Sequence, residues 1–490
     1  MKEDTIVKEN YDAIVVGGGL GGLLAGGLLA KKGLETLIVE KNPFLGGRCR
    51  TIEWDGFRAD VAPKVQTTYF NEPKDTWLYR ACEMLGVYLD LHTVSWHIVS
   101  VNKKGEEKPR FDPFDPRLGS QAFIDFFATM TGCNFNEKQR EELSRVLTEM
   151  GTVSEETCKE FLKMGFDEWS RKNVGDAVVQ TFFQGTTILA GVDVPDFPAG
   201  HMIGSMGAIH KGTFNFGYPI GAVLMDSLIG PLEKACKGFG CDIVKDMDVR
   251  RICTEHKQAN GAWLMDRKTD MLYKASAPVV VCAVPLYTAL GSFLDDDDFT
   301  ESERRFVEMT VKGKQDDYVG FYFLKDEVVP PDFPAWTHIF DFTIGGPVYR
   351  GDLYIPLGAN PPIGATGPKG KQLVLTYMIG GEEGPFGEDL PSYETIRKEE
   401  EEFEGLVEKV LPGFKKAIEH QGHVLSENWG RFCYLTHDPN DTVEIASKAV
   451  KGLYFAGDTP FVLGSLLGTE KCGRVGIECS DTILRDLGKN

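Results

Sequence analysis

The chain has 490 residues, of which 42% are hydrophobic and 26% are charged, so we expect two or more domains with separate cores. Its 73 acidic residues outnumber its 53 basic residues and give a net charge of −20. This charge argues against nucleic acid or a strongly anionic membrane as a partner, because both are bound through basic patches.

The chain contains eleven cysteines and nine histidines. No two cysteines form a C-x-x-C pair and the histidines show no H-E-x-x-H spacing, so we predict no metal site. The odd number of cysteines, and a start (MKEDTIVKEN) unlike a signal peptide, favour reduced thiols in a cytoplasmic protein. Short acidic runs at 295–298 and 399–404 are expected on solvent-exposed loop or helix faces.

The first distinctive segment is an uncharged run at 13–30. Its length suits a membrane span, but seven of its eighteen residues are glycine. A β-branched run at 14–16 is followed by a glycine cluster and then by an Ala/Leu run. That order predicts a buried strand, a tight turn and a helix rather than a membrane anchor.

The glycine cluster fits the spacing G-x-G-x-x-G with Gly17, Gly19 and Gly22. The first glycine would permit a sharp turn, the second would let the backbone approach a pyrophosphate, and the third would let the helix pack on the strand. The helix N-terminus would offer free N–H groups to the phosphates. A second apolar strand, predicted at 36–39, ends in Glu40, where a ribose hydroxyl would be held. Together these features predict dinucleotide binding.

Further small-residue segments accompany this pattern. The turn GGR at 46–48 carries a cation that could reach a pyrophosphate or a flavin ring. Near the C-terminus a predicted strand ends at Gly457 and Asp458, whose carboxylate could accept a hydrogen bond from a ribityl hydroxyl. Gly468 and Thr469 open a predicted last helix, whose N-terminus would stabilise negative charge on a flavin.

In this order, the blocks VVGGGLGGLLAG, ETLIVEKNPFLGGRCRT and GLYFAGD…GT…CGR resemble the flavin-containing superfamily of phytoene desaturases, carotenoid isomerases, retinol saturases, protoporphyrinogen oxidases and amine oxidases. A middle segment matches too: Tyr218, Pro219 and Gly221 fit the Tyr-Pro-x-Gly pattern of phytoene desaturase-like proteins. The resemblance is close in these blocks and holds elsewhere in their order only. It is specific for the FAD fold and not for the substrate.

The resemblance implies FAD as the cofactor and assigns its contacts residue by residue. Glu40, with Lys41 beside it, would bind the adenosine ribose, and Val249 would meet the adenine through its backbone. No second glycine fingerprint exists, so a bound nicotinamide cofactor is not supported. The implied cofactor-binding residues are Gly17, Gly19, Gly22, Glu40, Lys41, Gly47, Arg48, Val249, Gly457, Asp458, Gly468 and Thr469.

The implied fold class is α/β: a Rossmann-like FAD-binding domain of the glutathione reductase type with an inserted α+β substrate domain. The FAD-binding domain would be discontinuous, with segments at 1–66, 215–290 and 425–490. The substrate-binding domain would consist of 67–214, expected to be mostly helical, and 291–424, expected to mix strands with loops. Substrate would enter the crevice between the two domains.

Three functions stay open at this point. The first is desaturation, saturation or isomerisation of a carbon–carbon bond in a lipophilic substrate such as a polyene, isoprenoid or unsaturated acid, which the Tyr-Pro-x-Gly match favours. The second is an amine oxidase-like enzyme that takes a hydride from a C–N bond. The flavin-facing lysine of many amine oxidases aligns here with Asp317 or Tyr318, and Lys314 is out of register, which weighs against this function. The third is a non-catalytic flavoprotein.

The implied partners are a lipophilic small molecule and an electron donor or acceptor that the sequence does not identify. The protein is expected in the cytoplasm, and peripheral membrane contact and the oligomeric state are left open. For catalysis, Tyr318, Trp429, His437 and Glu470 could lie near the flavin ring. The two aromatics equally suit a core, His437 a loop, and Glu470 a first helical turn, where the dipole favours an acid. The catalytic residues are therefore unassigned.

Overall fold

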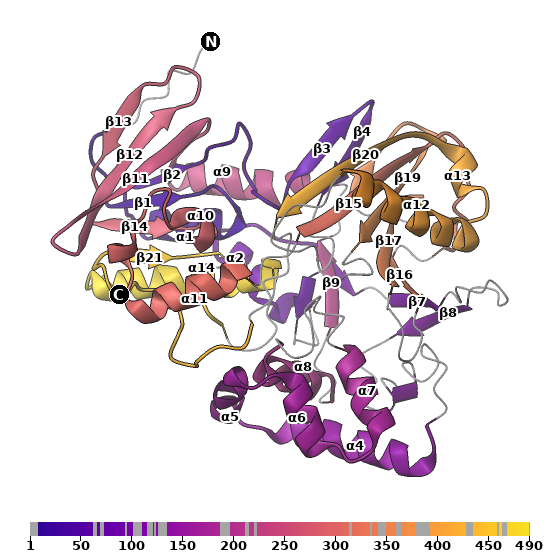
Figure 1. The fold of residues 1–490 in the computed structure, drawn as a ribbon. Coiled ribbons are helices and arrows are strands. Elements are labelled where there is room, and N and C mark those ends of the chain that lie inside the picture. The colour runs from indigo at the N-terminus through magenta and orange to yellow at the C-terminus, as the bar shows by residue number, and fades with distance from the viewer. Residues whose placement is uncertain are drawn as a thin grey trace.

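We describe the fold from a computed structural model of the chain. The ribbon separates into a lobe built on a parallel sheet, a lobe built on a larger mixed sheet, and a helical lobe (Figure 1). The structure describes residues 8–61, 66–68, 73–93, 96–100, 110–114, 121, 124–125, 135–186, 197–210, 215–219, 223–312, 316–333, 336–341, 349–358, 364–378, 393–427, 435–457, 460–462 and 468–489.

A five-stranded, fully parallel sheet forms the first lobe. In spatial order its strands are β10 (Asp242–Val244), β2 (Thr36–Val39), β1 (Ala13–Val16), β14 (Val279–Cys282) and β21 (Leu453–Phe455). The runs of Val, Ile and Leu in the central strands are fully buried, as expected for parallel strands that are covered on both faces. The strands come from segments that lie within 1–66, 215–290 and 425–490.

Four helices pack on one face of this sheet and share one hydrophobic cluster with it. They are α1 (Leu20–Lys31), α2 (Trp77–Met84), α9 (Gly230–Gly238) and α14 (Gly468–Asp486). Glycines let them approach closely: a Cβ on Gly476 would lie 2.9 Å from the Cβ of Leu24, and a Cβ on Gly473 would lie 2.5 Å from the backbone nitrogen of Leu78. The dinucleotide-type helix α1 is therefore held between α9 and α14.

The opposite face is covered by an antiparallel meander and two helices, which form a second cluster. These elements are β11 (Met247–Glu255), β12 (Gln258–Asp266), β13 (Leu272–Ala275), α10 (Leu286–Ala289) and α11 (Glu301–Lys312). Strand β1 serves both clusters, because Ala13 and Val15 contact the helices whereas Ile14 and Val16 contact the meander side. The parallel sheet is thus buried between two layers.

The second lobe is built on a seven-stranded mixed sheet. In spatial order its strands are β20 (Ile418–Glu427), β15 (Asp316–Leu324), β19 (Gln372–Met378), β17 (Tyr349–Leu357), β16 (Trp336–Asp341), β7 (Trp96–Ser100) and β8 (Arg110–Phe114). Helices α12 (Tyr393–Val410) and α13 (Phe414–Ala417) cover one face, where Tyr322 and Leu324 are buried. On the other face Phe321 and Phe323 pack against the small sheet of β3 (Thr51–Trp54), β4 (Phe57–Asp60) and β18 (Ala365–Thr366).

The third lobe is helical and has its own hydrophobic cluster. Its elements are α4 (Glu137–Thr152), α5 (Glu155–Glu160), the 3-10 turn η3 (Phe161–Lys163), α6 (Phe166–Asn173), α7 (Ala177–Thr186) and α8 (Ala199–His210). A reciprocal capping box between Asn136 and Gln139 fixes the start of α4. Nearby, β9 (Asn215–Pro219) pairs with β5 (Gln66–Thr68) and β6 (Leu91–Thr93) and carries Tyr218 and Pro219; Gly221 lies outside the described residues.

Two expectations need correction. The segment 67–214 was expected to be mostly helical, and in its described part β6, β7 and β8 are added to the helices and pair into two sheets. The acidic runs are not wholly solvent-exposed either: Glu400 is 1% exposed and Asp298 is 4% exposed. The buried carboxylate of Glu400 accepts a hydrogen bond from the hydroxyl of Tyr322 (2.9 Å), lies 2.8 Å from Nδ1 of His423 and pairs with Arg397, and these contacts compensate for its burial.

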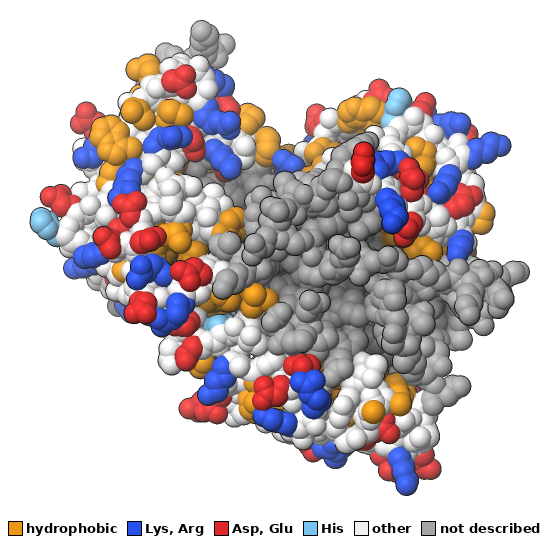
Figure 2. Space-filling model, viewed as in Figure 1, with side chains coloured by type: hydrophobic (Ala, Val, Ile, Leu, Met, Phe, Trp, Pro, Cys, Tyr) orange, Lys and Arg blue, Asp and Glu red, His pale blue; other side chains and the backbone are white. Residues whose placement is uncertain are grey.

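On the face shown in Figure 2, acidic and basic side chains are interspersed over the described parts of all three lobes. In the described part of the chain, none of the helices combines the length and the apolar character that crossing a membrane would require.

Candidate dinucleotide-binding site

The predicted glycine loop joins β1 to α1, and its three fingerprint glycines have different surroundings. Gly17 has φ +105°, and a Cβ there would lie 2.8 Å from Cγ1 of Val284. A Cβ on Gly22 would lie 2.0 Å from the carbonyl oxygen of Gly17, whereas a Cβ on Gly19 would have no neighbour within 4 Å. The fold itself therefore requires Gly17 and Gly22, whereas Gly19 borders open space beside the loop.

Helix α1 begins at this open side. Its N-cap is Gly19, which provides no side-chain hydrogen bond, and its first turn has no acidic residue. The first intrahelical bond runs from the N–H of Leu23 to the carbonyl of Gly19, so the N–H groups of 20–22 have no acceptor within the helix. Free N–H groups at the positive end of a helix dipole favour an anion. The loop therefore fits a pyrophosphate.

Glu40 lies at the end of β2, next to the loop, and is 5% exposed. Its Oε2 accepts a hydrogen bond from the backbone N–H of Gly18 (2.8 Å), and its Oε1 accepts from the backbone N–H (2.9 Å) and Nδ2 (2.8 Å) of Asn42. A carboxylate offers about four acceptor positions, so one remains for a ribose hydroxyl. Glu40 thus holds the loop in place, and it lies at the position where we expected the ribose hydroxyl to bind.

The predicted GGR turn packs directly on the glycine loop. The N–H of Gly46 donates to the carbonyl of Gly18 (2.9 Å), and Gly46 and Gly47 have φ values of +99° and +57°. A Cβ on Gly47 would lie 3.3 Å from the Cα of Gly19. Arg48, which follows, is partly buried. The structure therefore brings Gly19 and Gly47 together, although 28 residues separate them in sequence.

Lys41 and Val249 lie on the meander side of Glu40. The Lys41 side chain is exposed, and its carbonyl accepts a hydrogen bond from Nη1 of Arg267 (2.9 Å). Strand β11 is attached to this corner, since the N–H of Met247 donates to the carbonyl of Glu40 (3.0 Å). Val249, two residues further along β11, is 8% exposed. The backbone of β11 is thus placed beside the acid at the end of β2.

The C-terminal residues of the predicted site are only partly described. Gly457 ends β21 with φ +83° and touches the first turn of α1, where a Cβ on Gly21 would lie 2.3 Å from its Cα. Gly468 begins α14 with φ +55°, and Thr469 is buried. Asp458 lies outside the described residues. Gly457 therefore joins the glycine-loop group.

Of the four catalytic candidates, Glu470 and His437 have described side chains. Glu470 is fully buried in the first turn of α14, and its Oε1 accepts a hydrogen bond from the N–H of Leu78 at the start of α2 (3.0 Å). It therefore joins two helices, a contact that sequence reasoning missed because 392 residues separate the partners. Tyr318 lies on β15 opposite Met378, and Trp429 lies outside the described residues.

His437 lies in a loop, as expected, but its ring is packed against Phe306 and Phe461. Its Nδ1 lies 2.7 Å from the carbonyl oxygen of Leu435, so Nδ1 carries the proton and donates. Burial lowers the pKa of His437 below its ordinary range, against the opposing effect of that carbonyl. A neutral imidazole that fills an aromatic contact is a packing group, and the described surroundings assign it no catalytic role.

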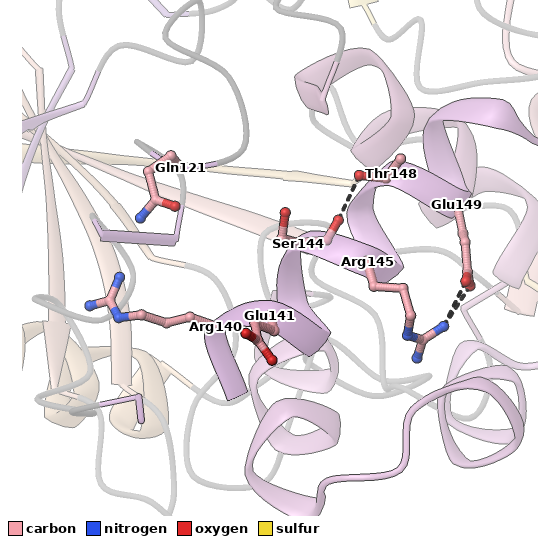
Figure 3. A pocket seen from close by; sticks show the side chains of 7 residues that line it. All are labelled: Gln121, Arg140, Glu141, Ser144, Arg145, Thr148 and Glu149. Atoms are coloured by element: carbon pink, nitrogen blue, oxygen red, sulfur yellow. Dashed lines mark hydrogen bonds and ion pairs between the residues drawn. The ribbon is translucent and has the colours of Figure 1, made fainter. Parts of the chain in front are cut away.

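The structure also shows a shallow polar pocket away from the glycine loop. It lies over α4 in the helical lobe, whereas β1 and α1 lie in the parallel-sheet lobe (Figures 1 and 3). Figure 3 shows Arg145 bonded to Glu149 (2.7 Å). Arg140 pairs with Asp125, which is not among the residues labelled there (2.6 Å). Its cations are neutralised and its walls are open, so we assign no ligand to it.

Together, the parallel sheet, the uncapped N-terminus of α1 and the acid after β2 define a dinucleotide-binding protein. Residues 15–79 match the family of NAD(P)-binding Rossmann-like domains. A prolycopene isomerase of Daucus carota is 22% identical, with 98% of this chain and 80% of the isomerase aligned. A carotenoid 3,4-desaturase of Haloarcula japonica is 32% identical over 24% of this chain and 25% of its own length. An all-trans-retinol 13,14-reductase of Danio rerio is 47% identical over a short segment, which is 11% of this chain and 9% of the reductase.

Solved structures give the same result for the fold. An oxidoreductase from Methanosarcina mazei matches with a TM-score of 0.66 at 17% identity, over 96% of this chain and 99% of its own. A putrescine oxidase matches with a TM-score of 0.64 at 14% identity, over 97% and 99%. These structures confirm the predicted α/β class with a Rossmann-like domain, and the relatives confirm the resemblance to the carotenoid desaturase, carotenoid isomerase and retinol saturase-like flavoprotein group.

Proposed function

We propose that the dinucleotide is FAD. The support is that Glu40, the glycine loop and the GGR turn meet at one place, where Gly47 adjoins Gly19 and leaves the backbone clear of side chains. A dinucleotide domain for a nicotinamide cofactor has no role for that turn or for the acid at Asp458. Asp458, Gly468 and Thr469 would hold the ribityl chain and flavin ring, and the remaining predicted residues would hold the pyrophosphate and adenosine.

We propose further that the protein is an FAD-dependent oxidoreductase that desaturates, saturates or isomerises carbon–carbon bonds of a lipophilic substrate such as a polyene. The observation that carries this proposal is the alignment of 98% of the chain with a prolycopene isomerase, supported by the desaturase and reductase matches. FAD, when bound, supplies hydride acceptor or donor chemistry. The protein would orient the double bond and keep water away from it.

The proposed domains follow the sequence ranges, except that α2 and α11 pack in the parallel-sheet lobe. The segments 1–66, 215–290 and 425–490 would bind FAD, and 67–214 with 291–424 would bind the substrate. The hairpin β3–β4, from the first segment, packs on β15 of the second lobe and so forms part of the junction. A crevice at this junction would admit the substrate. We propose peripheral contact with a membrane as one route by which a lipophilic substrate could reach this crevice.

The decisive experiment is anaerobic titration of the purified protein, followed by visible absorbance. Oxidised and chemically reduced forms would be mixed with a polyene, an unsaturated fatty acid, an enone and a polyamine. Bleaching of oxidised flavin by the polyene would identify a desaturase, and reoxidation of reduced flavin by the polyene or enone would identify a saturase. Bleaching by the polyamine alone would replace the proposal with an amine oxidase, whose fold a putrescine oxidase shares.

The cofactor assignment has its own test. Glu40→Ala and Asp458→Ala should each lower the flavin retained after gel filtration. Full occupancy in both variants would overturn the assigned contacts. Absence of flavin absorbance in the wild-type protein after reconstitution with FAD would overturn the cofactor itself.

A further inference from the structure

Helix α9 ends in a turn whose two closing residues are both cysteines. The N–H of Cys241 donates to the carbonyl of Cys236 (3.0 Å), and the N–H of Gly240, with φ +89°, donates to the carbonyl of Lys237 (3.0 Å). These two bonds define a Schellman motif, in which the outer pair of residues normally makes an apolar side-chain contact. Here that contact is made by two thiols.

The turn holds the two cysteines within reach of a disulfide bond. A 3.0 Å hydrogen bond between the Cys236 carbonyl and the Cys241 N–H limits their Cα separation to about 7 Å, given standard bond lengths. Disulfides require Cα separations of roughly 4.4–6.8 Å. The neighbouring Cys236 side chain is also the largest cause that raises the pKa of the Cys241 thiol, as expected for two thiols that the turn holds close together.

The same motif closes three other described helices without a second thiol. In α1 the outer pair is Leu29 and Leu34, in α2 it is Cys82 and Val87, and in α14 it is Leu484 and Lys489. None of these three pairs has sulfur at both positions, so the motif does not require two thiols. Only α9, among these four, carries sulfur at both positions, at 0% and 5% exposure.

Both thiols also contact the dinucleotide helix. Sγ of Cys236 lies 3.4 Å from the carbonyl oxygen of Leu23, and Sγ of Cys241 lies 3.7 Å from that of Gly26. A Cβ on Gly27 would lie 2.8 Å from Sγ of Cys236, so α1 approaches this thiol closely. The thiols therefore donate weak hydrogen bonds to the second turn of the helix whose N-terminus faces the proposed pyrophosphate.

We propose that Cys236 and Cys241 form a reversible intramolecular disulfide, a modification site behind the dinucleotide helix. The oxidant would be a small-molecule disulfide such as glutathione disulfide. The Cys241 thiolate attacks one sulfur of that disulfide and releases one small thiol, and Cys236 then displaces the second. Two protein S–H bonds are replaced by one S–S bond, and the small disulfide takes up two electrons and two protons as two thiols.

Access to the pair is controlled by one exposed segment. Residues 237–240 are exposed and are all that separates the two cysteines along the chain, so opening of this turn uncovers both thiols. In the closed turn, the neighbouring thiol of Cys236 and, next to it, burial raise the pKa of Cys241 and keep it protonated. The disulfide should therefore form slowly in the folded protein and faster when the turn opens.

Oxidation removes both S–H donors from α1. If FAD is the cofactor, as proposed above, this should loosen its binding. Because both lost hydrogen bonds are weak, we take their joint loss as the lower end of the range for one ordinary hydrogen bond, which corresponds to an increase of about threefold in the rate of FAD release. The disulfide itself does not depend on the identity of the cofactor.

The experiment equilibrates the full-length flavin-loaded protein in glutathione buffers of increasing disulfide content. Samples are acid-quenched, alkylated after denaturation, and read by peptide mass spectrometry. We expect the peptide with Cys236 and Cys241 to lose two hydrogen atoms and resist alkylation until dithiothreitol is added. Cys82 is the internal control: it closes the same motif opposite Val87 and should stay alkylated throughout.

A second arm measures FAD release from the oxidised and reduced proteins. The wild type should release FAD about threefold faster when oxidised, and Cys241→Val, which keeps an apolar contact, should show no such difference. Alkylation of both cysteines in folded protein, under conditions that oxidise them in guanidinium, would overturn the disulfide. If the disulfide forms but the rate of FAD release does not change, the proposed effect of the two thiols on α1 is wrong. Protein that never retains flavin would refute the proposed cofactor and leave the thiol result standing.

Discussion

The carboxylate of Glu40 and the backbone N–H of Gly18 form a 2.8 Å hydrogen bond between the end of β2 and the loop after β1. Glu40 was expected only to bind the ribose, but this bond shows that it also fixes the shape of the glycine loop. Its other oxygen accepts both donors of Asn42, so three of its about four acceptor positions are used within the fold and one is left for a ligand. Stability and dinucleotide affinity should therefore change together at this position.

Glu40→Gln tests that coupling. The amide can accept from only one side, so the variant should lose about 1–3 kcal/mol of unfolding free energy and should also bind the dinucleotide more weakly. Denaturant unfolding and flavin titration measure the two effects. Lys138→Gln, at an exposed residue of the helical lobe, should change neither. Unchanged stability and affinity in Glu40→Gln would show that the buried bonds are unimportant.

Two glycines of the fingerprint should separate folding from binding. Gly22→Ala places a Cβ 2.0 Å from the Gly17 carbonyl oxygen and should destabilise the protein by about 1–3 kcal/mol. Gly19→Ala meets no protein atom, so its melting temperature should match the wild type while its flavin content falls. Equal flavin retention in Gly19→Ala and wild type would remove Gly19 from the binding site.

The buried pair of Tyr322 and Glu400 predicts a stability effect in the second lobe. Tyr322→Phe removes one donor and should cost about 0.5–1.5 kcal/mol. Glu400→Ala removes the acceptor of that hydrogen bond and the nearest carboxylate of Arg397, and should cost about 1–3 kcal/mol. Arg397 keeps Glu401 and Glu404 as partners, which limits the loss. Chemical denaturation measures both losses. Glu402→Ala, at an exposed position on the same helix, should stay within about 0.5 kcal/mol of wild type. A loss in Glu402→Ala as large as in Glu400→Ala would contradict the burial argument.

His437 predicts a pH dependence of stability. Its folded pKa is lowered by burial, so the unfolded chain binds the proton more readily, with a pKa of about 6.5. Its contribution to stability is complete above that value and is lost as the pH falls through the lowered folded pKa. Melting temperatures between about pH 7.5 and pH 5.5 should fall less in His437→Gln than in wild type. His256→Gln, at a fully exposed histidine, should keep the wild-type pH profile.

The local part of the fold could be predicted from sequence, because β1, the glycine loop, α1 and β2 are continuous and each has its own pattern. Their order implies the parallel pairing of Ala13 with Thr36. Glu40 could be found for the same reason, by its distance from the glycines. The hydrogen bonds of Glu40 to Gly18 and Asn42 follow from its position, because the end of β2 lies beside the loop after β1.

The buried acids could not be found by composition. The acidic run 399–404 predicts a solvent-exposed side chain for Glu400, as for its neighbours. Its position is nevertheless on the apolar stripe of α12, three and four residues from Phe403 and Glu404 and seven from Val407, all buried. Its partners Tyr322 and His423 lie on different strands, and sequence spacing carries no information about such distant contacts.

The strand order of the parallel sheet has a consequence for how the protein is made. Strand β14 pairs on one side with β1, near the start of the chain, and on the other with β21, which leaves the ribosome 171 residues later. Until Leu453–Phe455 emerge, β14 presents an apolar, unpaired edge, and such edges recruit other nascent chains. The sheet that carries the glycine loop therefore cannot be completed until synthesis is almost finished. Binding of chaperones to the nascent chain should be greatest just before β21 appears.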